Sequence, residues 1–286
     1  MLKAILASAF LVAGTLVVGA QTIDNSALEK SDFRAHARTF GLVYILPHAV
    51  NDKLATTIGG MLREDLLKAG LTTEALMFNI PHVTVVHIHN SDPTTPEKML
   101  KVLPSLPGRI DLTLKTFYTT EAAKDAGRPW WLDLGIVKEG KGYEKMMAFN
   151  VTATAALDAL RDGPLPRVTG PVYAKMGDAA KSFVHTMGVS GVNIMQDGKA
   201  TSAHNPHNTL VYSMAPFTPA VQAAMNETAK NFNQVLPNGI ETTFATVSIV
   251  ELAFAGNVLR EIYRIDLDSG SVLEIATGKA MKLAKN

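Results

Sequence analysis

Two segments that lie far apart in the chain, "NIPHVTVVHI" at residues 79–88 and "NPHNTLVYS" at residues 205–213, share one frame. Each contains Pro-His-x-Thr followed by an apolar residue and valine. The residues of the frame that can carry chemistry are His82 and Thr84 in the first segment and His207 and Thr209 in the second. In both segments the apolar residues that follow are typical of a strand. The repeat predicts that each half of the chain contributes one strand of the same kind.

Strand geometry decides which of these side chains act together. Alternate side chains of a strand face the same way, so His82 and Thr84 are expected to project from one face. His207 and Thr209 are expected to do the same, while the residue between them points away. If the two strands lie side by side, two imidazoles and two hydroxyls surround one spot.

Such a group of side chains suits phosphodiester cleavage. Because the ordinary pKa of imidazole is about 6.5, one histidine can accept a proton while another donates one near neutral pH. Hydroxyl groups donate hydrogen bonds to oxygens that gain negative charge in the transition state. Side chains of the protein can then deprotonate the nucleophile, protonate the leaving oxygen and bind the phosphoryl oxygens. The pattern predicts an enzyme that needs no metal and no other cofactor.

The paired "HVTV" and "HNTL" resemble the two H-x-T/S-x signatures of the 2H phosphoesterase superfamily. This family includes 2',3'-cyclic phosphodiesterases, the so-called 2'-5' RNA ligases and related RNA-end processing enzymes. The resemblance implies an α+β fold of two pseudo-symmetric lobes, with antiparallel sheets flanking a central cleft and one motif per lobe. It implies that His82 and His207 are the acid and the base, in an order that the sequence leaves open. It also implies that Thr84 and Thr209 contact the phosphate.

The N-terminus predicts export. Residues 1–20 combine Lys3, an apolar run and the small-residue ending Val18-Gly19-Ala20, which is typical of a cleaved signal peptide. An uncleaved membrane anchor is the alternative. We therefore expect a secreted or periplasmic protein with no stable membrane association after cleavage. With no cysteine in the chain, packing rather than disulfides must stabilise it.

Composition and charge limit the partners. A chain of 286 residues that is 47% hydrophobic can bury a full core. Loss of Lys3 with the signal peptide would lower the formal net charge from +1 to 0. A neutral protein lacks the broad positive surface that binds long nucleic acid. The expected ligand is therefore a nucleotide or short oligonucleotide phosphate, and the oligomeric state is left open.

The remaining elements alternate between strands and helices. Residues 21–40 are predicted to be an N-terminal extension, and residues 41–286 to form the bilobal domain. We expect strands at residues 41–47, 82–88, 109–118, 130–140, 207–214, 242–255 and 258–267, and helices at 51–70, 95–106, 141–163 and 218–236. Asn51 and Thr218 are the expected caps of the first and last helices. Residues 163–203 are rich in glycine and proline and are expected to be irregular.

Two other functions are compatible with the sequence. A non-catalytic protein could use the same cleft to bind a phosphorylated ligand. A zinc-dependent hydrolase could use His87, His89 and Asp92 in "HIHNSD". Strand alternation, however, predicts that both of these histidines face away from His82 and Thr84, as polar residues at an exposed strand end.

Five aromatic residues are candidates for stacking a base: Tyr44, Trp130, Trp131, Tyr212 and Phe217. A regular strand would point Tyr212 away from His207, toward the core. Because Trp130 and Trp131 are adjacent, at most one of them faces a ligand.

Overall fold

The computed structural model describes residues 38–70, 76–78, 80–119, 130–161, 178, 193–200, 206–213, 217–252 and 256–283. The predicted signal peptide at residues 1–20 lies outside the described residues, as do most of residues 21–40 and most of residues 163–203. No helix in the described part of the chain is long and apolar enough to cross a membrane.

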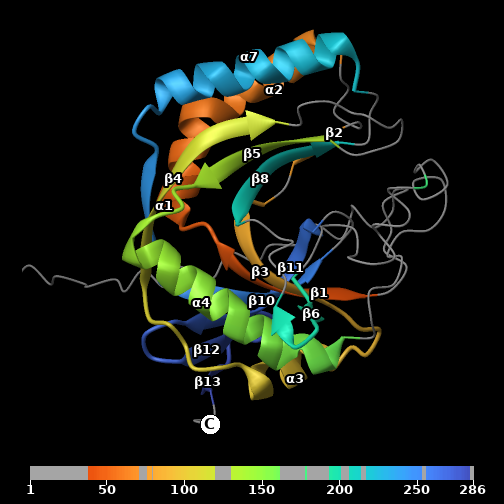
Figure 1. The fold of residues 1–286 in the computed structure, drawn as a ribbon, viewed down its shortest axis with the longest axis vertical. Coiled ribbons are helices and arrows are strands. Elements are labelled where there is room, and N and C mark those ends of the chain that lie inside the picture. The colour runs from red at the N-terminus through yellow and green to blue at the C-terminus, as the bar shows by residue number, and fades with distance from the viewer. Residues whose placement is uncertain are drawn as a thin grey trace, which may run out of the picture.

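One large antiparallel sheet dominates the protein (Figure 1). Among the described residues it has eleven strands, ten of them in the order β13-β12-β11-β10-β1-β3-β8-β5-β4-β9, with β2 pairing β8 off this path. The strands of the sheet are β1 (Thr39–Ile45), β2 (Leu76–Phe78), β3 (His82–His89), β4 (Ile110–Thr119), β5 (Trp130–Ile136), β8 (His207–Ser213), β9 (Ile240–Phe244), β10 (Thr246–Leu252), β11 (Val258–Asp266), β12 (Ser271–Glu274) and β13 (Ala280–Lys282). The α+β class predicted from the sequence is confirmed. The sheet is continuous, and the predicted symmetry of two lobes stays a prediction.

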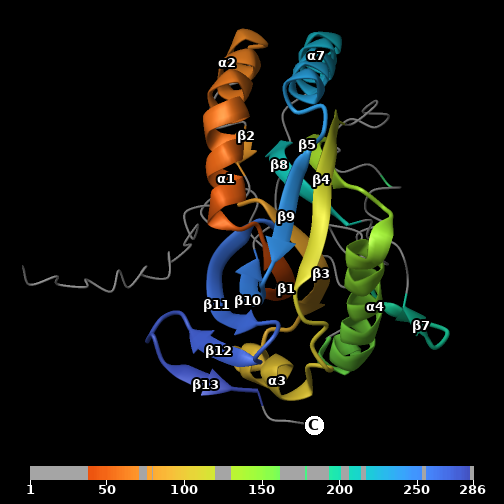
Figure 2. The ribbon, with the colours of Figure 1, turned by 90° about the vertical axis from the view of Figure 1, so that its left-hand side faces the viewer.

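Helices pack around this sheet. They are α1 (His48–Leu54), the π-helical turn η2 (Ala55–Gly59), α2 (Gly60–Lys68), α3 (Thr95–Val102), α4 (Gly140–Leu157), the 3-10 turn η4 (Asp158–Leu160) and α7 (Pro219–Val235). In Figure 2, α2 stands beside α7 at one end of the molecule, and α4 lies along β3 and β4. Within the described residues 193–200, a small separate ribbon pairs β6 (Met195–Gln196) with β7 (Lys199–Ala200).

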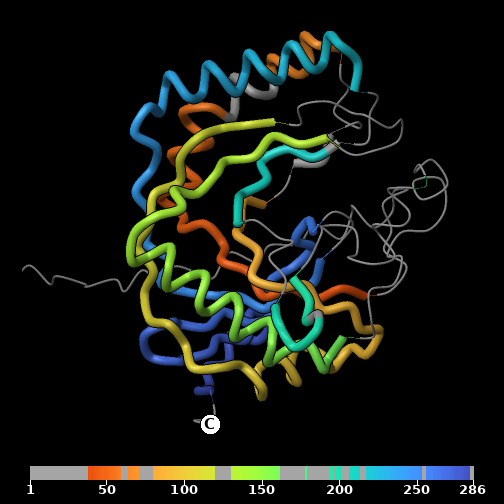
Figure 3. The backbone as a smooth tube through the Cα atoms, viewed as in Figure 1, coloured from red at the N-terminus to blue at the C-terminus, as the bar shows by residue number. Residues whose placement is uncertain are grey.

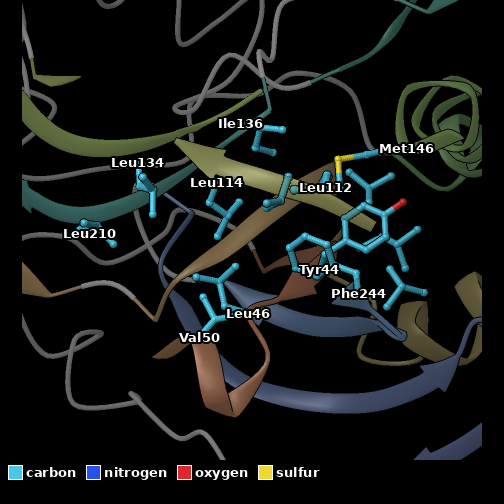
Figure 4. Close-up of a cluster of buried hydrophobic side chains, with 14 of the residues drawn as sticks. Tyr44, Leu46, Val50, Leu112, Leu114, Leu134, Ile136, Met146, Leu210 and Phe244 are labelled. Atoms are coloured by element: carbon cyan, nitrogen blue, oxygen red, sulfur yellow. The ribbon is translucent and has the colours of Figure 1, made fainter. Parts of the chain in front are cut away.

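Each of the five α-helices in the described part of the chain buries apolar side chains in one cluster. Val50, Leu66, Met99, Phe149 and Phe232 represent α1, α2, α3, α4 and α7 in it. Burial of one such side chain contributes roughly 1.5–3 kcal/mol to the free energy of unfolding. Figure 4 shows how the cluster continues onto the strands, where Tyr44, Leu112, Leu114 and Phe244 lie close to Met146 of α4.

The sheet has two different faces. On β1, Leu42 and Tyr44 point into the large cluster, and we call this side the helix face. Val43, between them, belongs to a second and smaller cluster on the other side, which we call the opposite face. The other buried members of the smaller cluster are Val250, Leu252 and Val258. Apolar side chains therefore hold β1 and its neighbours from both sides.

The middle of the sheet is a short overlap of β3 and β8. Both strands begin at the histidine that follows a proline, because proline has no backbone N–H to donate to a sheet. In this overlap Val83 pairs with Asn208. Figure 3 shows these two strands, far apart in the chain and therefore different in colour, meeting in the middle of the molecule.

The helix ends test two predicted caps. Thr218 caps α7 as predicted, since its hydroxyl accepts a hydrogen bond from the Val221 N–H at 3.2 Å. The predicted cap Asn51 is wrong, because α1 begins three residues earlier, after Pro47. The Asn51 amide instead donates to the Leu46 carbonyl at 3.2 Å, tying the helix to the end of β1.

A bulge in β4 approaches β5 closely at Gly135. Thr116 lies in the bulge with φ of 73°, an uncommon conformation for a β-branched residue. A side chain at Gly135 would put its Cβ 2.9 Å from the Lys115 carbonyl oxygen and 3.3 Å from the Tyr118 ring. On its other edge β5 pairs with β8, where Gly135 lies opposite His207. The bulge therefore packs against the part of β5 that lies next to this histidine.

The first prediction concerns this close approach. Gly135→Ala should lower the free energy of unfolding by about 1–3 kcal/mol, because the new methyl group meets backbone that cannot move aside. Urea unfolding followed by circular dichroism measures the change. A variant as stable as the wild type would mean that β4 and β5 are farther apart than described.

Candidate active site

A bulge in β3 decides where the residues after the first motif point. Val43 pairs with Thr84 but Leu42 pairs with Val86, so Val85 is an extra residue. The Asn193 amide donates to the Val85 carbonyl at 3.0 Å and so satisfies a backbone group within the bulge.

Because of this bulge, two predictions about the histidines after the motif are wrong. His87 and His89 were expected to face away from His82 and to lie at an exposed strand end. The extra residue reverses the alternation, so all three histidines lie on the opposite face of the sheet. His87 and His89 are also buried, each 1% exposed, and His89 Nδ1 lies 3.0 Å from the Thr39 hydroxyl.

A bulge in β8 follows the second motif at the same relative position. Asp133 pairs with Thr209 but Leu132 pairs with Val211, which leaves Leu210 as the extra residue. The prediction that Tyr212 points away from His207 is therefore wrong, since the bulge returns Tyr212 to the face of the histidine. Burial raises the pKa of Tyr212, and the charge of Asp133 raises it further, as expected if both side chains lie on the same face.

The register brings the four motif residues together. Val83 pairs with Asn208 in antiparallel strands, so the flanking positions pair His82 with Thr209 and Thr84 with His207. All four lie on the opposite face, because Val83 belongs to the cluster on the helix face. Side chains that oppose each other in this way have Cβ atoms about 4.5–5.5 Å apart. The two histidines thus occupy diagonal corners of a four-residue group.

Burial sets the protonation state of His82. The side chain is only 5% exposed, and burial lowers its pKa to about 4, with a further lowering by the nearby charge of His207. The Ile80 carbonyl lies 2.7 Å from Nδ1 and can only accept, so Nδ1 carries the proton. Nε2 of the neutral ring is therefore left with a lone pair that can take up a proton.

Asp133 extends the group onto the next strand. It pairs with Thr209, is 3% exposed, and places Oδ2 3.7 Å from Nε2 of His207. Burial raises the pKa of Asp133 to about 6, against the smaller lowering effects of His207 and of a hydrogen bond from Thr209. A carboxylate beside an imidazole stabilises the protonated ring and fixes its orientation.

Asp133 is the residue of the site that the sequence analysis missed. Alternation along "WWLDLG" would have shown that it faces away from Leu132 and Leu134, both of which are buried on the helix face. The pattern alone could not show that this strand lies beside the second motif. That information is carried by the pairing of β5 with β8.

Aromatic side chains lie around this row of polar groups. Tyr118 on β4 pairs with Asp133, and burial and the charge of Asp133 raise its pKa. Trp131 lies two residues before Asp133 on the same face and is partly exposed. Trp130 is instead fully buried on the helix face, 5.7 Å from the Phe217 ring by centroids. Of the five candidate aromatics, Tyr44, Trp130 and Phe217 therefore contribute to the core.

The alternative zinc site does not assemble within the described residues. Among them no group of three or more histidine, cysteine, aspartate or glutamate side chains is arranged to hold a metal ion. Asp92 lies at the start of α3, where it accepts hydrogen bonds from Thr94 at 2.8 Å and from Lys98 at 2.5 Å. The carboxylate of Asp92 is therefore engaged at the N-terminal end of α3. The hydrogen bonds from Lys98 and Thr94 lower the pKa of Asp92 to about 2.

No protein-family model and no curated protein matches the chain. The solved structures similar to it include two of Usb1 from Kluyveromyces marxianus, one of them with uridine monophosphate. Both are 7% identical to this chain and superpose with a TM-score of 0.37. They match 76% of this chain and 96% and 97% of their own. A likeness of this degree does not establish a family, and the chemistry of the site follows from its own residues.

The second prediction concerns the buried imidazole. A histidine whose pKa falls on folding stabilises the protein above its unfolded pKa of about 6.5 and loses this contribution as the pH falls toward 4. The lowering of the pKa to about 4 corresponds to about 3 kcal/mol. The stability of the wild type relative to His82→Gln should therefore fall by up to about 3 kcal/mol between pH 7 and pH 4.

Urea unfolding at several pH values measures this difference. His48→Gln is the matched control, because it removes an imidazole that is 77% exposed and has no burial cost. Asp133 acts in the opposite direction in wild type and variant alike, so its contribution cancels in the comparison. A constant difference between wild type and His82→Gln would contradict the buried, neutral state of His82.

Proposed function

We propose that this protein is a metal-independent phosphoesterase that hydrolyses a cyclic phosphate or a phosphodiester of a nucleotide or short oligonucleotide. The observation that carries the proposal is the β3–β8 overlap, whose register sets two His-x-Thr motifs side by side on one face. Such an arrangement provides a proton acceptor, a proton donor and hydroxyl groups around one phosphate. The ligand would occupy a central cleft between two related lobes.

In this proposal His82 is the general base. Its Nδ1 is held by the Ile80 carbonyl and its ring is neutral at pH 7, so Nε2 can accept a proton from the attacking water. A pKa near 4 describes a weak base. An anionic phosphate bound within a few ångströms would favour the protonated ring and raise this pKa toward the working pH.

His207 is then the general acid. The attacking water loses its proton to His82 as its oxygen bonds to phosphorus, and the bond from phosphorus to the leaving oxygen breaks. The leaving oxygen takes the proton of His207, whose protonated form the Asp133 carboxylate stabilises before transfer. Exchange with solvent restores both histidines. Thr84 is proposed to donate to a phosphoryl oxygen, and the phosphate contact expected for Thr209 is limited by its hydrogen bond to Asp133.

Aromatic residues support a nucleotide as the substrate. Trp131 is partly exposed on the face of the histidines, and Tyr118 lies at the end of the same row. Aromatic side chains stack bases of any sequence and contribute about 1–3 kcal/mol per base. Export of the mature protein to the periplasm or the extracellular space, proposed from residues 1–20, would put this activity on nucleotides outside the cytoplasm.

The test is hydrolysis of a panel of 2',3'-cyclic nucleotides by the mature protein in the presence of EDTA. His82→Ala and His207→Ala should each lower kcat/KM by at least about 100-fold, since each removes one proton transfer. His48→Ala, on the surface of α1, is the control and should retain wild-type activity.

Each other outcome has a distinct meaning. Wild-type turnover that EDTA abolishes would support a metal-dependent hydrolase. Tight binding of a nucleotide without turnover would support the binding protein. Activity that survives either histidine substitution would contradict the two-histidine mechanism.

A further inference from the structure

We propose that Asp133 is a positioning residue of this site that holds His207 and Thr209 as one unit. The inference rests on the proposed function and extends it to a third strand. Asp133 pairs with Thr209 in the register of β5 and β8, and its Oδ2 lies 3.7 Å from His207 Nε2. One buried carboxylate thus contacts both chemistry-bearing residues of the second motif.

The neighbours of Asp133 show that packing does not require a carboxylate there. Leu132 and Leu134, on either side, supply the core contacts of β5 from the helix face. Oδ1 of Asp133 is buried and accepts no hydrogen bond from the described residues, which is costly for a carboxylate. A buried charge that weakens the fold and faces two reactive groups is typical of a functional site.

The contact with Asp133 makes the two threonines unequal. Thr209 donates its proton to the carboxylate and cannot donate that proton to a phosphate at the same time. Thr84 lies between Val43 on β1 and His207 on β8, with no carboxylate beside it on either strand. Thr84 is therefore the hydroxyl that donates to the substrate phosphate, and Thr209 reaches it only when Asp133 is protonated.

Among the described residues, few titratable groups lie near Asp133 on the opposite face. They are His207 and Tyr212 on β8, Tyr118 on β4 and, beyond Thr209, His82 on β3. Burial raises the pKa of both tyrosines above their usual range, so neither ionises between pH 5 and pH 9. Asp133, whose pKa burial raises to about 6, should then be ionised and effective above pH 6 and lose its effect as the pH falls below it.

The experiment compares the wild type with Asp133→Asn, which keeps the shape and removes the charge. We expect kcat for a 2',3'-cyclic nucleotide to fall about 10- to 100-fold while KM changes less than about threefold. The decline of kcat/KM below pH 6 should become shallower in the variant. The melting temperature at pH 8 should equal or exceed that of the wild type, because the buried ionised group is gone.

Asp111→Asn is the matched control, since Asp111 is an exposed carboxylate on β4 that hydrogen-bonds Thr243 at 2.6 Å. It should leave kcat and its pH profile unchanged. For Asp133→Asn, a melting temperature at pH 8 below that of the wild type, together with a fall in kcat, would assign Asp133 a structural role only and overturn the proposal. Unchanged kcat and pH profile would overturn it while leaving the two-histidine mechanism intact.

A readout without turnover separates this inference from the proposed function. In NMR spectra of the unliganded protein, the side-chain signals of Thr209, which has no titratable group of its own, should show a titration step near pH 6 that comes from Asp133 and disappears in Asp133→Asn. The step can be present even if no cyclic nucleotide is hydrolysed, in which case only the proposed function fails. Absence of the step in the wild type would overturn the positioning role.

Discussion

The antiparallel overlap in which Val83 faces Asn208 joins the two halves of the sheet, and the site depends on its register. Both strands start at the residue after a proline, so an overlap at their starts brings His82 and His207 to one place. Because a strand rises about 3.4 Å per residue, a slip of two residues would move the histidines about 7 Å relative to each other. On the other side of β8, the Asn208 amide donates to the Leu134 carbonyl of β5 at 3.3 Å. This buried amide on the helix face thus holds β8 against β5, the strand that carries Asp133 on the opposite face.

Sequence alternation predicted the facing of side chains correctly only as far as each bulge. Up to Thr84 and Thr209 the period of two holds, and beyond them the extra residues Val85 and Leu210 reverse it. Nothing in an apolar run such as "TVVHI" distinguishes a paired residue from an extra one. The bulge in β3 is accompanied by a hydrogen bond from Asn193, more than 100 residues away in the chain. Long-range contacts of this kind leave no local pattern, so the facing of the later side chains could not be predicted.

The positions of the helices and strands along the chain were easier to predict than the order of the strands in the sheet. A Thr-Pro start and apolar spacing are enough to locate α7, because its cap and its buried face are local properties. The order of strands in the sheet is not local. It inserts β8 between β3 and β5, although β8 follows β5 by about 70 residues in the chain. Asp133 lies beside the second motif only because of this insertion. The two motifs therefore indicate the four histidine and threonine residues of the candidate site but not Asp133.

The two motifs are alike in sequence but lie between different neighbours. On one side β3 is flanked by β1, whose Val43 and Ile45 cover the opposite face with apolar groups. On the other side β8 is flanked by β5, which offers Asp133 and Gly135. Burial therefore acts mainly on His82 and favours its neutral ring, whereas His207 lies 3.7 Å from the buried carboxylate of Asp133. In the proposed mechanism, the difference between the base and the acid thus arises from the flanking strands, which would let a chain that repeats one motif carry out two opposite proton transfers.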